Sequence, residues 1–247
     1  MPRFFVKANQ VQNEIIKILG EDVNHIKNVL RKNIDSEIEI CNQDSGKAYH
    51  CKILSIKDDE ILCNILEEMK EQESRVKVDI YQGLPKADKM EFIIQKSVEL
   101  GVNSIIPVKM SRCIVKIDKK DEKKKLDRWN KISESAAKQC GRNFIPEIKP
   151  MIDIKDIINL KDKYDEILIA YENEKENYIK NELIKLKELK QELNLAIIIG
   201  PEGGLEEKDV MVLKENGAKI VSLGNRILRT ETVALNILSV IMYELEN

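Results

Sequence analysis

From residue 76 to the end of the chain, short apolar runs alternate with segments of helical periodicity. Several of the apolar runs are continuous, as in strands that are buried on both faces of a sheet. Strands that alternate with helices form a mainly parallel sheet covered by those helices. The sequence therefore predicts an α/β domain over residues 73–247. We expect its strands at 76–84, 104–110, 165–170, 195–200 and 218–223, and its helices at 88–101, 121–141, 174–193, 205–216 and 232–245.

The first seventy residues follow a different pattern, with short, largely alternating runs separated by turn residues. Runs at 37–41, 48–56 and 60–66 predict strands of a small β-barrel or sandwich. One segment, 21–32, has helical periodicity, and its apolar face is formed by Val23, Ile26, Val29 and Leu30. The charged stretch 67–74 predicts a boundary, so we expect a β-barrel domain at 1–72 and an α/β domain at 73–247.

Several classes of protein are disfavoured by simple counts. No run approaches the roughly eighteen apolar residues of a membrane span, and "MPRFFVKANQ" has charges too close to its apolar residues for a signal peptide. We therefore expect a cytoplasmic protein with no membrane partner. The five cysteines form no CxxC pair, and only two histidines accompany them. We expect reduced cysteines that pack as small hydrophobes, and no metal site.

The net charge of −2 hides a local excess of basic residues. Residues 112–142 contain eleven Lys or Arg against five Asp or Glu, and residues 1–32 contain six against three. This asymmetry favours a basic face that binds nucleic acid. The alternative for the lysine run 119–125 is a solvated helix face.

Two glycine-containing loops follow apolar runs, "IIGPEGG" at 198–204 and "LGNRILRTET" at 223–232. Neither loop matches a phosphate-binding P-loop or a dinucleotide-binding pattern. Carboxylates crowd the first loop and would repel a phosphate, so a neutral or cationic ligand is expected. Glycines let the backbone approach a ligand such as adenine or ribose closely, and Thr230 or Thr232 is expected to cap the last helix. The alternative is a pair of connecting turns.

The last predicted helix, 232–245, is apolar on almost every side, and only Asn236, Ser239 and Tyr243 form a polar stripe. A terminal helix of this kind must be buried on two faces. The sheet covers one face, and a second copy of the chain is the natural cover for the other. The sequence therefore predicts a homodimer through the C-terminal domain.

The two loops together resemble those of the SPOUT-class methyltransferases, and more narrowly those of the enzymes that methylate N3 of a uridine in 16S ribosomal RNA. Further segments carry the same resemblance: "RFFV", "HIKNVLR" (25–31), "KADKMEFIIQKSVELGV" (86–102) and "RWNKISESAAKQCGR" (128–142). The departures are small, with Asn225 where proline or serine is common and Cys140 where serine is frequent.

The resemblance implies a C-terminal domain with a deep trefoil knot, an exception to the rule that chains do not thread loops. It also implies a PUA-like RNA-binding barrel and a dimeric enzyme. The cofactor would be S-adenosyl-L-methionine, with S-adenosyl-L-homocysteine as product, and the substrate one uridine of 16S rRNA in the assembled small ribosomal subunit. The expected cofactor-binding residues are Ile199, Gly200, Pro201, Glu202, Gly203, Gly204, Leu223, Gly224, Ile227, Leu228 and Thr232.

Methyl transfer to uracil N3 requires in-line placement and loss of the N3 proton. Negative charge then develops on the flanking carbonyl oxygens, and a fixed guanidinium would stabilise it. Arg229 is our first catalytic candidate. Glu202 and Glu231 are candidate bases, although each also suits a helix-start charge or a backbone cap, and water is an alternative proton acceptor. The expected RNA-binding residues are Arg3, His25, Arg31, Lys86, Lys89, Arg112, Arg128, Gln139 and Arg142.

Two other functions remain open at this point. A non-catalytic RNA-binding factor of ribosome assembly would keep the basic face but need no cofactor pocket. An enzyme of small-molecule metabolism on a doubly wound sheet would leave the basic cluster at 112–142 unexplained.

Overall fold

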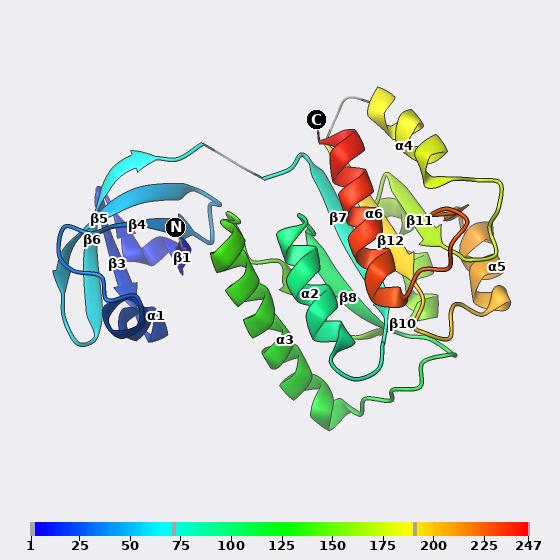
Figure 1. Ribbon diagram of the computed structural model, residues 1–247, viewed down its shortest axis with the longest axis horizontal. Coiled ribbons are helices and arrows are strands. Elements are labelled where there is room, and N and C mark those ends of the chain that lie inside the picture. The colour runs from blue at the N-terminus through cyan, green and yellow to red at the C-terminus, as the bar shows by residue number, and fades with distance from the viewer. Residues whose placement is uncertain (1–2, 71–72, 190–191, 247) are drawn as a thin grey trace. The chain divides into compact units, whose positions relative to one another are not determined.

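A computed structural model describes residues 3–70, 73–189 and 192–246 of the chain. It contains two compact units, each with its own sheet (Figure 1). One unit consists of Met1–Glu73 and Glu134–Ile145, and the other of Ser74–Ser133 and Pro146–Asn247. The division falls within helix α3 (Lys119–Cys140), so this helix contributes residues to both units.

The N-terminal unit is built on a six-stranded sheet with the strand order β1-β4-β5-β6-β3-β2. Only β1 and β4 pair in parallel, and the other pairs are antiparallel. Two register shifts between β5 and β6 bend the sheet around its core. The three strands expected from the sequence are present, and three short strands and a 3₁₀ turn join them. The bounds are β1 (Arg3–Val6), η1 (Ala8–Gln10), β2 (Val11–Gln12), β3 (Ile15–Leu19), β4 (Glu37–Asn42), β5 (Ala48–Ile56) and β6 (Glu60–Glu68).

The helical segment expected at 21–32 is shorter and less regular than its periodicity suggests. A turn of α-helix, α1 (Glu21–Asn24), continues as the π-helix η2 (His25–Val29). Val23 and Ile26 enter the core of the N-terminal unit, as expected. Val29 is 62% exposed, so its expected place on the apolar face is wrong. The wider π turn rotates later residues relative to an α-helix, which explains this difference.

Buried thiols contribute to the same core. Cys51 and Cys63 pack among its isoleucines, and burial raises the pKa of each thiol to about 12. Burial likewise raises the pKa of Cys41 to about 11. None of the five cysteines forms a disulfide, which agrees with small hydrophobes for the buried ones, whereas Cys140 is exposed.

The C-terminal unit contains a seven-stranded sheet with the order β10-β8-β7-β12-β11-β13, and β9 pairs with β8 beside β10. Every described strand pair of this sheet is parallel, which confirms the expected sheet type. Two short strands and one 3₁₀ helix were not expected. The strands are β7 (Val76–Gly83), β8 (Ser104–Lys109), β9 (Glu147–Ile148), β10 (Ile152–Asp153), β11 (Glu166–Ala170), β12 (Leu193–Ile199) and β13 (Lys219–Val221). The helices are α2 (Lys89–Glu99), η3 (Ile154–Lys163), α4 (Ile179–Glu188), α5 (Glu207–Glu215) and α6 (Thr230–Leu245).

Both faces of this sheet are covered, because successive residues of a strand point to opposite sides. Ile169 and Ile198 pack in one core with Leu213 of α5 and Ile157 of η3. The intervening residues, such as Ile197, face the other side, where α6 contacts β7 and β12. Figure 1 shows α2 and α6 next to each other over this second face.

The last helix, α6, receives more cover from its own chain than its sequence suggested. It packs against α2 and α4 as well as against the sheet. The expected polar stripe is exposed, and Tyr243 within it is 74% accessible. A second copy of the chain is therefore not needed to bury most of the apolar residues of α6.

Candidate functional site

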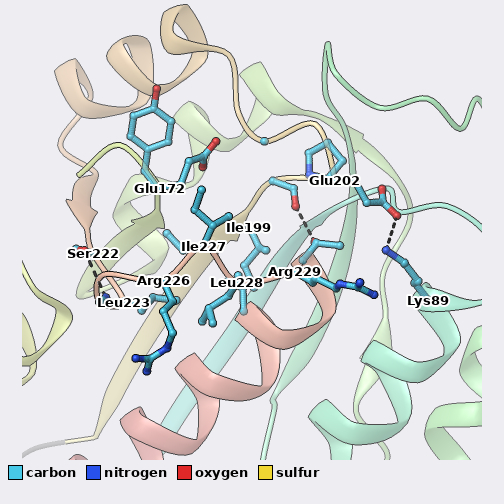
Figure 2. A pocket seen from close by; sticks show the side chains of 18 of the residues that line it. Lys89, Glu172, Ile199, Glu202, Ser222, Leu223, Arg226, Ile227, Leu228 and Arg229 are labelled. Atoms are coloured by element: carbon cyan, nitrogen blue, oxygen red, sulfur yellow. Dashed lines mark hydrogen bonds and ion pairs between the residues drawn. The ribbon is translucent and has the colours of Figure 1, made fainter. Parts of the chain in front are cut away.

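A cavity of about 350 Å³ opens at the carboxyl edge of the parallel sheet (Figure 2). Ligands of open α/β sheets bind at this edge, and the volume falls in the range of small-molecule pockets. The segments that follow β11, β12 and β13 form most of the wall. The lining residues are Lys89, Ala170, Tyr171, Glu172, Lys175, Ile199, Gly200, Pro201, Glu202, Gly204, Ser222, Leu223, Gly224, Arg226, Ile227, Leu228, Arg229, Thr230 and Val233.

The first loop turns sharply at the end of β12. Gly204 donates its backbone N–H to the carbonyl of Pro201 at 2.9 Å and has a φ of +70°, which favours glycine. A Cβ on Gly200 would lie 2.9 Å from the carbonyl carbon of Gly204. A Cβ on Gly83, at the end of β7, would lie 2.6 Å from Pro201. The glycines therefore allow backbone segments to meet closely beside the cavity.

A buried threonine joins the two loops. The hydroxyl of Thr230 donates to the carbonyl of Gly200 at 2.7 Å and accepts from the side-chain amide of Gln82 at 2.9 Å. This pair of hydrogen bonds connects the start of α6 to the ends of β12 and β7. The expected capping role of Thr230 or Thr232 is wrong, because α6 begins with Arg229 as its N-cap and has no side-chain cap hydrogen bond.

The two candidate bases, Glu202 and Glu231, share a single cation. Lys89 Nζ lies 3.0 Å from Glu202 Oε1 and 3.3 Å from Glu231 Oε2. Glu202 Oε1 also accepts the backbone N–H of Lys86 at 3.0 Å. Burial raises the pKa of Glu202, but the hydrogen bonds from Lys86 and Lys89 outweigh it and hold the pKa below its usual value. Glu202 is therefore a stable carboxylate and a poor proton acceptor.

Arg229 is the N-cap of α6, and its exposed side chain lines the cavity. Figure 2 shows the guanidinium extending toward the side where Lys89 and Glu202 lie. The ion pairs of the described residues include none to Arg229. Its charge is thus available to a bound molecule.

Most of the expected cofactor-binding residues lie together on the cavity wall. The exceptions are Gly203 and Thr232, which are not among the lining residues. The carbonyl of Gly203 accepts a hydrogen bond from Arg112 Nη1 at 3.0 Å, and Thr232 is exposed on α6.

Sequence reasoning missed one side of the cavity, formed by Ala170, Tyr171, Glu172 and Lys175. These residues follow β11, which is the parallel neighbour of β12, with Ala170 paired to Ile199. The end of the predicted strand 165–170 was the only trace of them in the sequence, and its place beside β12 becomes known from the sheet order. Lys89, expected to contact RNA, instead pairs with the two glutamates. Ser222, Arg226, Thr230 and Val233 also line the cavity without having been expected there.

The expected RNA-binding residues divide between the two units and differ in exposure. In the N-terminal unit, Arg3 is only 2% exposed and hydrogen-bonds Glu39 and the carbonyl of Gly141. Arg142 pairs with Glu73 at 2.9 Å and has little exposed surface. Both guanidiniums therefore have structural roles and are poorly placed to contact phosphate. The exposed residues of the expected set are His25, Arg31 and Gln139 in this unit, and Lys86, Arg112 and Arg128 in the C-terminal unit.

The described residues include no group of three or more His, Cys, Asp or Glu side chains placed to hold a metal ion. None of the described helices is both long enough and apolar enough to cross a membrane.

The chain matches two family models. One, described as the RNA methyltransferase domain, covers residues 72–242, and the other, described as the RNA methyltransferase PUA domain, covers residues 18–66. These matches agree with the two folds observed, a small β unit and a parallel α/β unit. The PUA-like character expected of the N-terminal unit is confirmed.

Similarity to named relatives extends over nearly the whole length. The chain is 39% identical to the ribosomal RNA small subunit methyltransferase E of Bacillus subtilis (strain 168), over 100% of this chain and 98% of that protein. It is 34% identical to the protein of the same name from Mesomycoplasma hyopneumoniae (strain 232), over 97% and 98% of the two chains. A crystal structure of a ribosomal RNA small subunit methyltransferase E from Neisseria gonorrhoeae bound to S-adenosyl methionine has a TM-score of 0.84. The two chains are 29% identical, and the match covers 98% of this chain and 97% of the Neisseria gonorrhoeae chain.

Proposed function

The chain belongs to the RNA methyltransferase family that includes the ribosomal RNA small subunit methyltransferases E, and we propose that it methylates ribosomal RNA with S-adenosyl-L-methionine. The finer proposal is transfer to N3 of one uridine in 16S rRNA, within the assembled small subunit. Such a substrate would place the enzyme in the cytoplasm. S-Adenosyl-L-homocysteine would be the second product.

One observation carries the proposal: a cavity between two glycine-containing loops that are joined through Thr230. The glycine backbone provides close-range donors and acceptors, while Ile199, Leu223 and Leu228 provide apolar surface for a flat base. The volume and this mixed lining suit an adenosyl group. When bound, the cofactor supplies an electrophilic methyl group on a positively charged sulfur.

Arg229 would act on the RNA base. Its guanidinium stands at the cavity without an ion-pair partner among the described residues. A fixed cation aimed at the uracil carbonyl oxygens stabilises the negative charge that develops as N3 loses its proton. Arg229 is thus the proposed catalytic residue.

The proposed proton acceptor changes once the ion pairs are known. Glu202 is held as a carboxylate by Lys86 and Lys89 and would accept a proton poorly. Glu231 Oε2 also lies 3.3 Å from Lys89 Nζ, but only Glu202 accepts in addition the backbone N–H of Lys86. We therefore favour Glu231 or water over Glu202 as acceptor.

RNA would be held by exposed basic and polar residues of both units. We retain His25, Arg31, Gln139, Lys86, Arg112 and Arg128 as proposed contacts. Phosphate contacts by Lys and Arg position a substrate, whereas contacts to the target base specify it.

A homodimer through the C-terminal domain is also part of the proposal. Neighbouring helices expose apolar side chains on this unit, with Ile184 of α4 at 50% and Tyr243 of α6 at 74% accessibility. Large exposed side chains on neighbouring helices support this surface as the proposed interface.

The test has two parts. Calorimetry with S-adenosylhomocysteine should show saturable binding to the purified protein, which a non-catalytic RNA-binding factor would lack. Mass mapping of 16S rRNA from cells with and without the gene should then show one methylated uridine that disappears with the gene. Absence of nucleoside binding would overturn the methyltransferase proposal, and an unchanged modification map would overturn the substrate.

A further inference from the structure

Glu172 presents a carboxylate at the cavity from a segment outside the two glycine loops. It lies two residues beyond the end of β11, is exposed, and belongs to the cavity wall. In Figure 2 it stands across the cavity from Lys89 and Glu202. Glu172 thus faces the same space as the candidate catalytic residues but from another strand.

The position of this carboxylate depends on a glycine of the first loop. A Cβ on Gly204 would collide with Glu172 Oε1. Gly204 also has a φ of +70°, which favours glycine, and a Cβ there would force the end of the Glu172 side chain to move. The loop and Glu172 fit together, and the carboxylate lies directly against the backbone that curves around the ligand space.

The two acidic residues of the cavity wall differ in their partners. Glu202 is neutralised by Lys89 at 3.0 Å and by the N–H of Lys86. The ion pairs of the described residues include none to Glu172, and Lys175 Nζ donates to its backbone carbonyl rather than to its carboxylate. The acceptor oxygens of Glu172 are therefore available to a ligand.

The place of Glu172 in the sheet suggests which ligand group it meets. β12 ends in the glycine loop, and β11 is its hydrogen-bonded parallel neighbour. In dinucleotide-binding sheets, an acidic residue after a neighbouring strand accepts hydrogen bonds from ribose hydroxyls, while the glycine loop holds the adjacent part of the nucleotide. A carboxylate has two oxygens and accepts two donors at once, as the vicinal hydroxyls of a ribose require.

We propose that the carboxylate of Glu172 accepts hydrogen bonds from the 2′- and 3′-hydroxyls of the cofactor ribose and so selects ribonucleosides. This inference rests on the proposed adenosyl cofactor and adds the residue that recognises its sugar. Glu172 is a binding residue and takes no part in the movement of protons or of the methyl group.

The experiment compares Glu172→Gln with the wild-type protein by calorimetry. Glutamine keeps the size of the side chain but removes the charge and one acceptor, so affinity for S-adenosylhomocysteine should fall about tenfold to a hundredfold. Glu176→Gln, an exposed carboxylate of the same loop that does not line the cavity, is the matched control and should bind as wild type does.

Competition with adenosine and 2′-deoxyadenosine then identifies the group that Glu172 contacts. The wild-type protein should prefer adenosine by about tenfold or more, and this preference should shrink to about twofold in Glu172→Gln. Gly204→Ala, whose added methyl group displaces the carboxylate, should lose the same preference.

Three outcomes separate the possibilities. If the wild type binds S-adenosylhomocysteine and Glu172→Gln binds it equally well, the ribose assignment is wrong while the methyltransferase proposal stands. A loss confined to S-adenosylmethionine would point to the sulfonium charge and would also overturn the assignment. If the wild type binds neither S-adenosylhomocysteine nor S-adenosylmethionine, the proposed function itself is wrong. Thermal unfolding of the three variants, Glu172→Gln, Glu176→Gln and Gly204→Ala, checks that they are folded.

Discussion

Three arginines differ in their burial and in their ion-pair partners. Arg3 is buried against Glu39, and Arg142 pairs with Glu73 beside the ring of Phe144. Arg229 instead stands exposed at the cavity. Desolvating a guanidinium is costly unless it is paired, so the carboxylate partners of the first two hold them in structural roles, and the third remains available for chemistry.

Replacement of Arg229 tests this distinction. Arg229→Ala should lower the single-turnover rate constant for methylation about a hundredfold or more, because a donor to the developing charge is removed. Affinity for S-adenosylhomocysteine should change by no more than about twofold, because the cavity wall keeps its backbone. The measurement is single-turnover methylation of small subunits at saturating cofactor and RNA. Near-normal turnover of the variant would refute the proposed role, and Arg229→Lys, which keeps the charge, should retain part of the activity.

Glu202 predicts a dependence of stability on pH. Its folded pKa lies below the unfolded value of about 4.3 because the hydrogen bonds from Lys86 and Lys89 outweigh its burial. The stabilisation from Glu202 is therefore fully present above about pH 4.3 and is lost as the pH falls through the lower folded pKa.

The unfolding free energy of Glu202→Gln should be about 1 kcal/mol below that of the wild type at neutral pH. This difference should be unchanged between pH 7 and about pH 4.3 and should shrink as the pH falls further. Urea unfolding at several pH values measures it, with Glu176→Gln as a control that shows no such trend. A difference that stays constant with pH would contradict the assignment.

At the scale of elements, the sequence was most informative where local pattern and tertiary environment agree. The parallel strands β7, β8, β11 and β12 were predicted, because strands buried on both faces are apolar throughout. The two-residue strands β9 and β10 were missed, because pairing with β8 defines them and leaves no periodicity in so short a segment.

Helix α4 shows a second limit of sequence patterns. The expected helix spanned 174–193, but α4 begins only at Ile179. Glu174 accepts the backbone N–H groups of Glu176 and Asn177 and so holds this stretch in a turn. Side chains that bond to nearby backbone compete with helix formation, and hydropathy does not reveal this competition.

The connection between α6 and the sheet gives a third prediction. Thr230→Val removes the hydroxyl that donates to Gly200 and accepts from Gln82, and leaves buried polar groups unpaired. We expect a loss of about 1–3 kcal/mol in unfolding free energy and weaker nucleoside binding, because both loops lose a shared support. Urea unfolding and calorimetry measure the two effects. Thr230→Ser keeps the hydroxyl and should recover most of both. A loss in Thr230→Ser as large as that in Thr230→Val would contradict the role assigned to the two hydrogen bonds.

For the molecule as a whole, the sequence located the cavity but only part of its wall. The loops at 198–204 and 223–232 were found because glycine and strand ends are visible in one dimension. The segment that includes Glu172 was missed because only the order of strands in the sheet places β11 next to β12. Likewise, burial of Arg3 depends on partners more than a hundred residues away. The trefoil knot stays a prediction of the family resemblance.

Binding to RNA should depend strongly on salt. Removal of one side chain that neutralises a phosphate should reduce the slope of log affinity against log salt concentration by about 0.7–0.9. Arg31→Ala removes one such proposed side chain and should weaken binding of a 16S rRNA fragment with a correspondingly smaller slope. Lys180→Ala, an exposed lysine of α4, serves as the control. Binding that is independent of salt would contradict an electrostatic RNA surface.

Self-association is the remaining prediction at this scale. Light scattering at micromolar concentration should give the mass of a dimer, and a monomer would refute the proposal. Tyr243→Arg places a charge on the exposed face of α6 and should shift the protein toward monomer. Met211→Arg makes the same kind of change on α5, which packs on the opposite face of the sheet, and should leave the mass unchanged.

Because α3 contributes residues to both compact units, it limits which fragments of the chain can fold by themselves. The N-terminal unit includes Glu134–Ile145, and within it Gly141 and Asn143 are hydrogen-bond partners of Arg3. A fragment ended after residue 73 would thus lack part of this unit, and buried Arg3 would keep Glu39 but lose two of its acceptors, Gly141 and Asn143. Expression of residues 1–73 alone, or their exchange between relatives, should yield insoluble protein. A fragment in which residues 134–145 are joined to residues 1–73 should contain the whole N-terminal unit.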